Sequence, residues 1–188
     1  MIFNLSLKHQ LPEDAIVIDV TSNSSSFGRL LSPFNLGPVH LYDEYIAQSV
    51  ENGYSFSKIF EQFDNGNGEP TSLYLDWAKA GWENQKPIKY PLGAWSKHLY
   101  FWWDGKKISK KEGFKKIFTP LYKEAVLKTT AYQKLKDMCK NSNKDIYLID
   151  YEGFDYEFLG LSLKDVFDQD DFPIGQGFVL LGMLNGVL

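Results

Sequence analysis

Three short apolar runs, each bounded by turn-forming residues, constrain most strongly how this chain can fold. Residues 15–20 read Ala-Ile-Val-Ile-Asp-Val, between a proline and a serine-rich stretch, which predicts a buried strand that leads into a polar loop. Residues 36–42 and 145–150 predict two more strands for the same reason. Runs this short, with no internal repeat between them, indicate a small sheet.

Segments with helical spacing lie between and after these runs. Helices are predicted over residues 46–60, over residues 71–81 with Thr71 as N-cap and Gly81 as stop, and over residues 113–139 with an interruption at Pro120. Residues 177–187 are apolar nearly all round, which predicts a buried helix or strand.

Two other segments have no clear apolar period. Residues 87–103 predict a loop rich in proline and aromatic residues, and Asp104-Gly105 predicts a turn. The lysine-rich residues 106–116 predict the solvated start of a helix. The chain is 188 residues long and shows no linker, so we expect one α+β domain over residues 1–188, with a small sheet packed by helices.

Charge and composition exclude several functional classes. The net charge of −4 argues against a broad nucleic-acid interface, because phosphate backbones require a basic face. The single Cys139 cannot form an internal disulfide and has no partners at zinc-like spacing, so we expect a reducing cytoplasm and no metal. No signal peptide and no membrane span is expected, and no glycine-rich nucleotide motif indicates a dinucleotide cofactor.

A candidate acid/base group lies within the predicted helix 46–60. Glu51, Ser55 and Lys58 are separated by steps of four and three, which would place them on one stripe of a helix. A carboxylate and an ammonium two turns apart can face the same space, as two acid/base groups that line one side of a site must. The alternative is a solvated helix face that carries ordinary charges.

Arg29 is the only arginine of the chain, and a run of serines at residues 24–26 comes before it. Backbone N–H groups and hydroxyls of such a loop can bind a phosphate while the guanidinium contacts it in a bidentate way. The alternative is an ordinary surface loop.

Asp150 ends a predicted buried strand, a position where active-site carboxylates often lie.

Several of these motifs together resemble the NADAR superfamily, whose proteins are associated with NAD and ADP-ribose. The resemblance in the first part of the chain rests on Phe27-Gly28-Arg29, Leu31-Ser32-Pro33-Phe34, Tyr42-Asp43, Ser49-Val50-Glu51 and Lys58. In the second part it rests on residues 122–135, residues 146–150, Asp155, Gly160, Gly175-Gln176 and residues 181–184. Three departures point to a divergent bacterial or phage branch: Pro33 in place of Asn, Asn52 in place of His, and no Trp between Asp155 and Gly160.

The resemblance implies an N-glycosidase that cleaves the base–ribose bond of a nucleotide or ADP-ribose-type substrate, either free or attached to a macromolecule. Such a reaction needs a carboxylate near the sugar, a donor for the departing base and an anchor for phosphate. The candidate catalytic residues are Glu51, Lys58 and Asp155, and the candidate ligand-binding residues are Arg29, Ser32, Phe34, Tyr54, Ser55, Trp103 and Asp150.

Two other classes of function stay open. A non-catalytic protein could sequester or sense an ADP-ribose-derived or cyclic nucleotide in the same pocket, because the second acid motif is weakened. A structural interaction protein would leave Glu51 and Arg29 without a chemical role. We expect an enzyme that needs no cofactor.

Overall fold

The computed structural model describes residues 1–169 and 171–188 of the chain. It confirms the predicted α+β class, because helices pack on small sheets. The chain divides into two compact units: the first combines Met1–Ser32 with Val126–Leu188, and the second is Pro33–Ala125. The expectation of one domain stays a prediction, under which the two units would unfold in a single transition.

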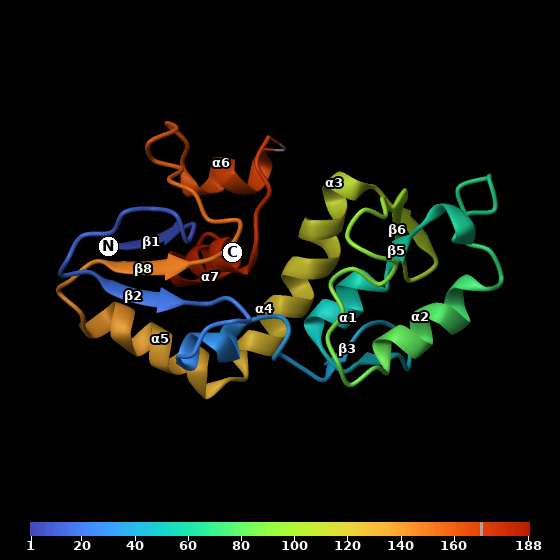
Figure 1. Ribbon diagram of the computed structural model, residues 1–188, viewed down its shortest axis with the longest axis horizontal. Coiled ribbons are helices and arrows are strands. Elements are labelled where there is room, and N and C mark those ends of the chain that lie inside the picture. The colour runs from blue at the N-terminus through green and yellow to red at the C-terminus, as the bar shows by residue number, and fades with distance from the viewer. Residues whose placement is uncertain (170) are drawn as a thin grey trace. The chain divides into compact units, whose positions relative to one another are not determined.

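The sheet of the first unit is parallel and has three strands. Its strands are β1 (Ile2–Leu5), β2 (Ile16–Asp19) and β8 (Ile146–Ile149). Strand β8 lies between the other two, as Figure 1 shows, and Ile146 pairs with both Ile2 and Ile16. The strands predicted over residues 15–20 and 145–150 are therefore confirmed, while β1 was missed because its four residues carry no distinct pattern.

Helices complete the first unit. They are the 3₁₀ helix Phe27–Leu31, α5 (Thr130–Asn141), α6 (Leu163–Asp168) and α7 (Gln176–Leu184). Helix α7 confirms the prediction of a buried apolar element, since its residues from Gln176 to Gly182 are buried. Phe178 and Leu181 of α7 pack with Val166 and Phe167 of α6 in one apolar cluster.

The second unit contains antiparallel strands and short helices. Its strands are β3 (Val39–His40), β4 (Ile46–Ala47), β5 (Lys58–Ile59), β6 (Tyr100–Trp103) and β7 (Lys106–Ile108). Its helical elements are α1 (Val50–Ser55), the 3₁₀ helix Glu61–Phe63, α2 (Tyr74–Trp82), α3 (Lys110–Gly113) and the π-helical turn Phe114–Phe118. Helix α4 (Thr119–Leu127) continues from that turn.

The helix predicted over residues 46–60 is wrong in length. Only Val50–Ser55 is helical, and strands occupy both flanks: β4 pairs with β3, and β5 pairs with β6. Ser49, in an extended conformation, caps the helix by accepting a hydrogen bond from the amide of Asn52. Strand pairing, with the nearby β3 on one side and the distant β6 on the other, therefore overrides a local helical period.

Two predicted helix breaks also differ from the structure. Gly81 does not end α2 but lies inside its last turn. Packing accounts for the glycine at this position, because a Cβ there would overlap the ring of Phe56. Pro120 does not break the long helical region, since the preceding π-helical turn already carries wider hydrogen bonding, with the Thr119 amide donating to the Phe114 carbonyl. The break comes at Thr129, which N-caps α5.

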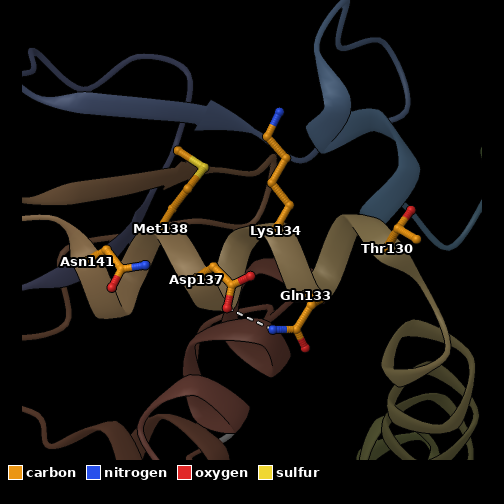
Figure 2. A pocket seen from close by; sticks show the side chains of 6 residues that line it. All are labelled: Thr130, Gln133, Lys134, Asp137, Met138 and Asn141. Carbon is orange, nitrogen blue, oxygen red and sulfur yellow. Dashed lines mark hydrogen bonds between the residues drawn. The ribbon is translucent and has the colours of Figure 1, made fainter.

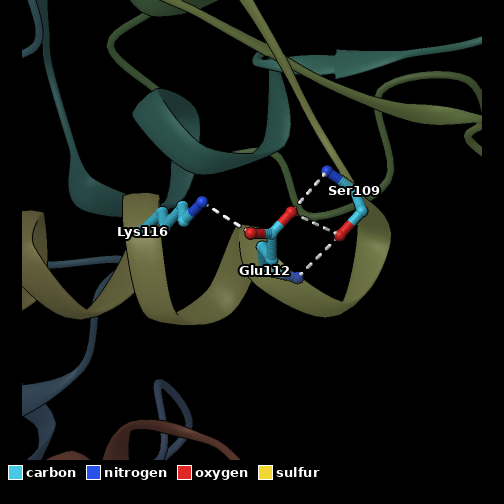
Figure 3. Close-up of polar contacts among 3 residues, drawn as sticks. All are labelled: Ser109, Glu112 and Lys116. Carbon is cyan, nitrogen blue, oxygen red and sulfur yellow. Dashed lines mark hydrogen bonds and ion pairs between the residues drawn. The ribbon is translucent and has the colours of Figure 1, made fainter.

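The segment from residue 87 to residue 116 is more regular than predicted. The loop ends at Leu99, and β6 and β7 form a hairpin around the predicted Asp104-Gly105 turn, where both residues have positive φ (49° and 68°). A capping box then starts α3: Ser109 accepts from the Glu112 amide, and the Glu112 carboxylate also contacts Lys116 (Figure 3). Within the described part of the chain, no helix has the length and apolar character needed to cross a membrane.

Candidate functional site

Glu51, Ser55 and Lys58 meet in the second unit, as predicted, but not on a helical stripe. Glu51 and Ser55 lie one turn apart in α1, where Ser55 Oγ donates a hydrogen bond to Glu51 Oε1 at 2.9 Å. Lys58 lies in β5, and the bend after Phe56 returns its Nζ to 3.4 Å from Ser55 Oγ, to which it donates. The predicted grouping thus arises from a helix followed by a turn into a strand.

The group is withdrawn from water. Glu51 is only 5% exposed and Ser55 is fully buried. Burial lowers the pKa of Lys58, the charge of Glu51 opposes this effect, and the nearby charge of Lys89 adds to it. The amine of Lys58 therefore releases a proton more readily than an ordinary lysine.

Aromatic rings form one wall of this group. Tyr54 stacks on Phe101 at 5.0 Å between ring centroids, and Phe118 contacts it edge-on at 5.3 Å. Lys58 Nζ lies 4.8 Å from the centre of the Tyr54 ring, within the range of a cation–π contact. Burial, followed by the charge of Glu51, raises the pKa of Tyr54, so its hydroxyl stays protonated near neutral pH.

Asn52 fixes the loop that lies next to this group. The fully buried Asn52 donates from Nδ2 to the carbonyls of Asn84 and Lys86 at 2.8 and 3.1 Å, and its Oδ1 accepts from the Ile88 amide at 2.8 Å. The loop then brings the carbonyl of Lys89 to 3.1 Å from Ser55 Oγ. The sequence drew attention to Asn52 only as a departure from the NADAR pattern, and this loop-holding role was missed.

His98 is a second group that sequence reasoning did not place here. Its ring lies 4.8 Å from that of Phe101, and its buried Nε2 has no hydrogen-bond partner among the described residues. Burial, with the charges of Lys58 and Lys110, lowers the pKa of His98 to about 4. His98 is therefore a neutral imidazole at neutral pH.

Trp103 and Phe34 are the other two aromatic candidates of the second unit. Trp103 contacts Tyr42 edge-on at 5.0 Å between ring centroids. Phe34 is half-buried shortly before β3. That Trp103 and Phe34 hold a base of the ligand stays a prediction.

The two acids of the first unit contact backbone amides. Asp150 is fully buried; its Oδ1 accepts from the Tyr151 amide and its Oδ2 from the Gly177 amide in the first turn of α7, each at 2.8 Å. Its carboxylate thus acts as a remote cap of that helix. Asp155 is exposed, and its Oδ1 accepts from the Phe158 amide at 3.0 Å, as in an ordinary turn.

Arg29 and Ser32 also belong to the first unit. Arg29 is exposed on the 3₁₀ helix Phe27–Leu31, which Ser26 caps by accepting from the Gly28 amide. Ser24 Oγ and Ser26 Oγ hydrogen-bond each other at 3.0 Å, so these hydroxyls stabilise their own loop. Ser32 is buried, and its backbone N–H donates to the Arg29 carbonyl at the end of the helix.

A cleft of about 500 Å³ also lies along α5 in the first unit (Figure 2). Gln133 donates a hydrogen bond to Asp137 at 2.8 Å, and Lys134 lies over the Phe27 ring at 4.2 Å. All of its described lining residues come from this single helix. The cleft therefore lacks polar groups that converge from several elements, as a specific site requires.

No protein family model matches the chain, and no curated protein matches its sequence. The resemblance to the NADAR superfamily therefore stays a prediction. The contacts of Glu51, Ser55 and Lys58 are independent of that resemblance, and they carry the functional argument that follows.

Proposed function

We propose that the protein is an N-glycosidase that hydrolyses the base–ribose bond of a nucleotide or ADP-ribose-type substrate. The observation that carries this proposal is the buried Glu51 carboxylate, which shares the Ser55 hydroxyl with the amine of Lys58. A carboxylate withdrawn from water stabilises a nearby positive charge more strongly than an exposed one. The cation that develops at the sugar when a glycosidic bond breaks is such a charge.

The other groups have complementary roles in this proposal. As the C1′–N bond breaks, its electron pair goes to the base, and water supplies the hydroxyl that adds to C1′. The proton of that water is balanced by protonation of a neutral base, or is released to solvent when the base is the cationic nicotinamide ring. Lys58 is suited to donate hydrogen bonds to the ribose or the phosphate, since its ammonium has three N–H groups and its bond to Ser55 is long, at 3.4 Å. The proposal includes a cytoplasmic location and membership of a divergent NADAR branch. The support for that membership is the set of residues that resemble the superfamily.

The test follows the release of a free base. The purified protein is incubated with NAD, with ADP-ribose and with ADP-ribosylated nucleic acid, and released species are identified by mass spectrometry. Glu51→Gln keeps the shape of the side chain but removes its charge, so turnover should fall by a factor of about 100 or more while binding survives. Glu61→Gln, at an exposed acid in the same unit, is the matched control.

Failure of this proposal has a clear form. Unchanged turnover in Glu51→Gln would reject Glu51 as the catalytic carboxylate. An equal loss in Glu61→Gln would mean that the effect comes from the net charge of the unit and not from this position.

A second candidate function is a nucleotide-binding protein without catalysis. The observation that favours it is Asp155, the proposed second acid, which is exposed and accepts a hydrogen bond within its own turn. A pocket without a second acid can keep its affinity while it loses stabilisation of the transition state. Complete recovery of unmodified ligand after long incubation, for nucleotides that bind tightly, would support this function and exclude hydrolysis.

A further inference from the structure

A cleft of about 370 Å³ in the second unit shares no lining residue with the group around Glu51. Its size is within the range of small-molecule sites. The segments that line it are the turn between β3 and β4, the start of α2 and the hairpin of β6 and β7. The lining residues are Tyr42, Asp43, Tyr45, Pro70, Thr71, Ser72, Tyr74, Leu75, Trp102 and Gly105.

Aromatic rings supply much of this lining. Tyr42 and Tyr45 meet nearly at a right angle (85°), with 5.4 Å between ring centroids. Trp102 joins them from β6, half-buried. The ring of Tyr45 already holds an ammonium, because Lys79 Nζ lies 4.9 Å from its centre. These rings therefore offer electron-rich faces to a cation.

The described polar side chains that line the cleft are acidic or neutral, while the ammonium of Lys79, outside the lining, contacts the Tyr45 ring. Asp43 is exposed on the turn with a φ of 47°, and no lysine, arginine or histidine is among the described residues that line the cleft. Burial raises the pKa of Tyr42, and the neighbouring Tyr45 and the charges of Asp43 and Asp104 add to this effect. Thr71 Oγ1 is buried and has no hydrogen-bond partner among the described residues.

We propose that this cleft binds a small organic cation, either a quaternary ammonium or an N-alkylated aromatic ring. Its aromatic faces and the Asp43 carboxylate favour positive charge, while a neutral ligand of the same shape gains only apolar contact. This site does not depend on the proposed hydrolysis, since it shares no residue with that group.

The test compares choline with its neutral isostere 3,3-dimethylbutan-1-ol, with binding followed by NMR shifts of the tryptophan indole N–H signals. Choline should bind at least about fivefold more tightly than the isostere. Asp43→Asn should remove most of this preference, and Asn tolerates the positive φ at this position. Glu44→Gln removes the same charge one residue away, outside the lining, and should keep the preference.

Aromatic variants provide a second measurement. Tyr45→Leu should weaken choline binding severalfold, whereas Tyr45→Phe keeps the ring and should bind choline like the parent protein. Equal affinity for choline and the isostere, or no binding of either up to about 20 mM, would overturn the proposal. Equal losses in Asp43→Asn and Glu44→Gln would also overturn it, because the effect would then be a general one of charge.

Discussion

The charge of Glu51 should control the proton affinity of Lys58, and this link can be measured without knowledge of a substrate. Ser55 Oγ lies 2.9 Å from Glu51 Oε1 and 3.4 Å from Lys58 Nζ, so the carboxylate oxygen and the ammonium are at most about 6.3 Å apart. At an effective dielectric constant of about 20, two unit charges at that separation attract each other by about 2.6 kcal/mol. The separation is an upper limit, so this attraction is a lower limit at that dielectric constant.

The perturbation is Glu51→Gln, which keeps a carbonyl oxygen for the Ser55 hydroxyl. Because the Glu51 charge opposes the effect of burial on Lys58, its removal should lower the pKa of Lys58 further. The attraction given above corresponds to a rise of about eightyfold in the acid dissociation constant of the ammonium.

The assay is a pH titration of the lysine ¹³Cε chemical shifts, with the Lys58 signal assigned by its loss in Lys58→Arg. Glu61→Gln serves as the control, since Glu61 is exposed and does not contribute to the Lys58 pKa. An unchanged or higher pKa of Lys58 in Glu51→Gln would refute the electrostatic coupling, and with it the acid/base role of this group.

Three other predictions concern stability. His98 has a pKa of about 4 in the folded chain against 6.5 when free, so folding favours its neutral form. The unfolding free energy should therefore fall by about 1–2 kcal/mol from pH 6.5 to pH 4, after allowance for the partial exposure of His98, and urea unfolding of His98→Gln should show a smaller fall. Gly81→Ala should cost about 1–3 kcal/mol by overlap with the Phe56 ring, despite a gain of about 1 kcal/mol in helix propensity, and a net gain in unfolding free energy would contradict this packing. Asn52→Ala should cost about 2–4 kcal/mol and speed hydrogen exchange at the Ile88 amide, and unchanged exchange there would show that the loop is held by other contacts.

The buried elements of the first unit could be predicted because their own residues determine them. Strand β8 and the apolar segment that became α7 bury most of their side chains, so a local pattern was sufficient. Strand β2 buries only Ile18 of its four residues, and its β-branched run with turn-forming residues on both sides was the signal that predicted it. The second unit was harder to predict. Its helix α1 is short because the paired strands β4 and β5 flank it. The partner of β5 is the distant strand β6, and such pairing leaves no local signal.

The candidate site shows the same contrast. Glu51 and Ser55 could be paired from their spacing in the sequence, since four residues make one helical turn. The part of Asn52 could not be foreseen, because its three partners lie more than thirty residues further along the chain. His98 was equally hidden, since its altered pKa depends on burial and on lysines that the fold brings near.

The two halves of the site therefore have different structural support. The contact between Glu51 and Ser55 is internal to α1 and needs only a helical turn. Lys58 is held by the pairing of β5 with β6, in which it lies opposite Phe101, and Phe101 also stacks on Tyr54. A change in the hairpin of β6 and β7 can thus move the amine while the carboxylate and the hydroxyl keep their contact. Trp102, which lines the second cleft, comes directly after Phe101 in the same strand β6.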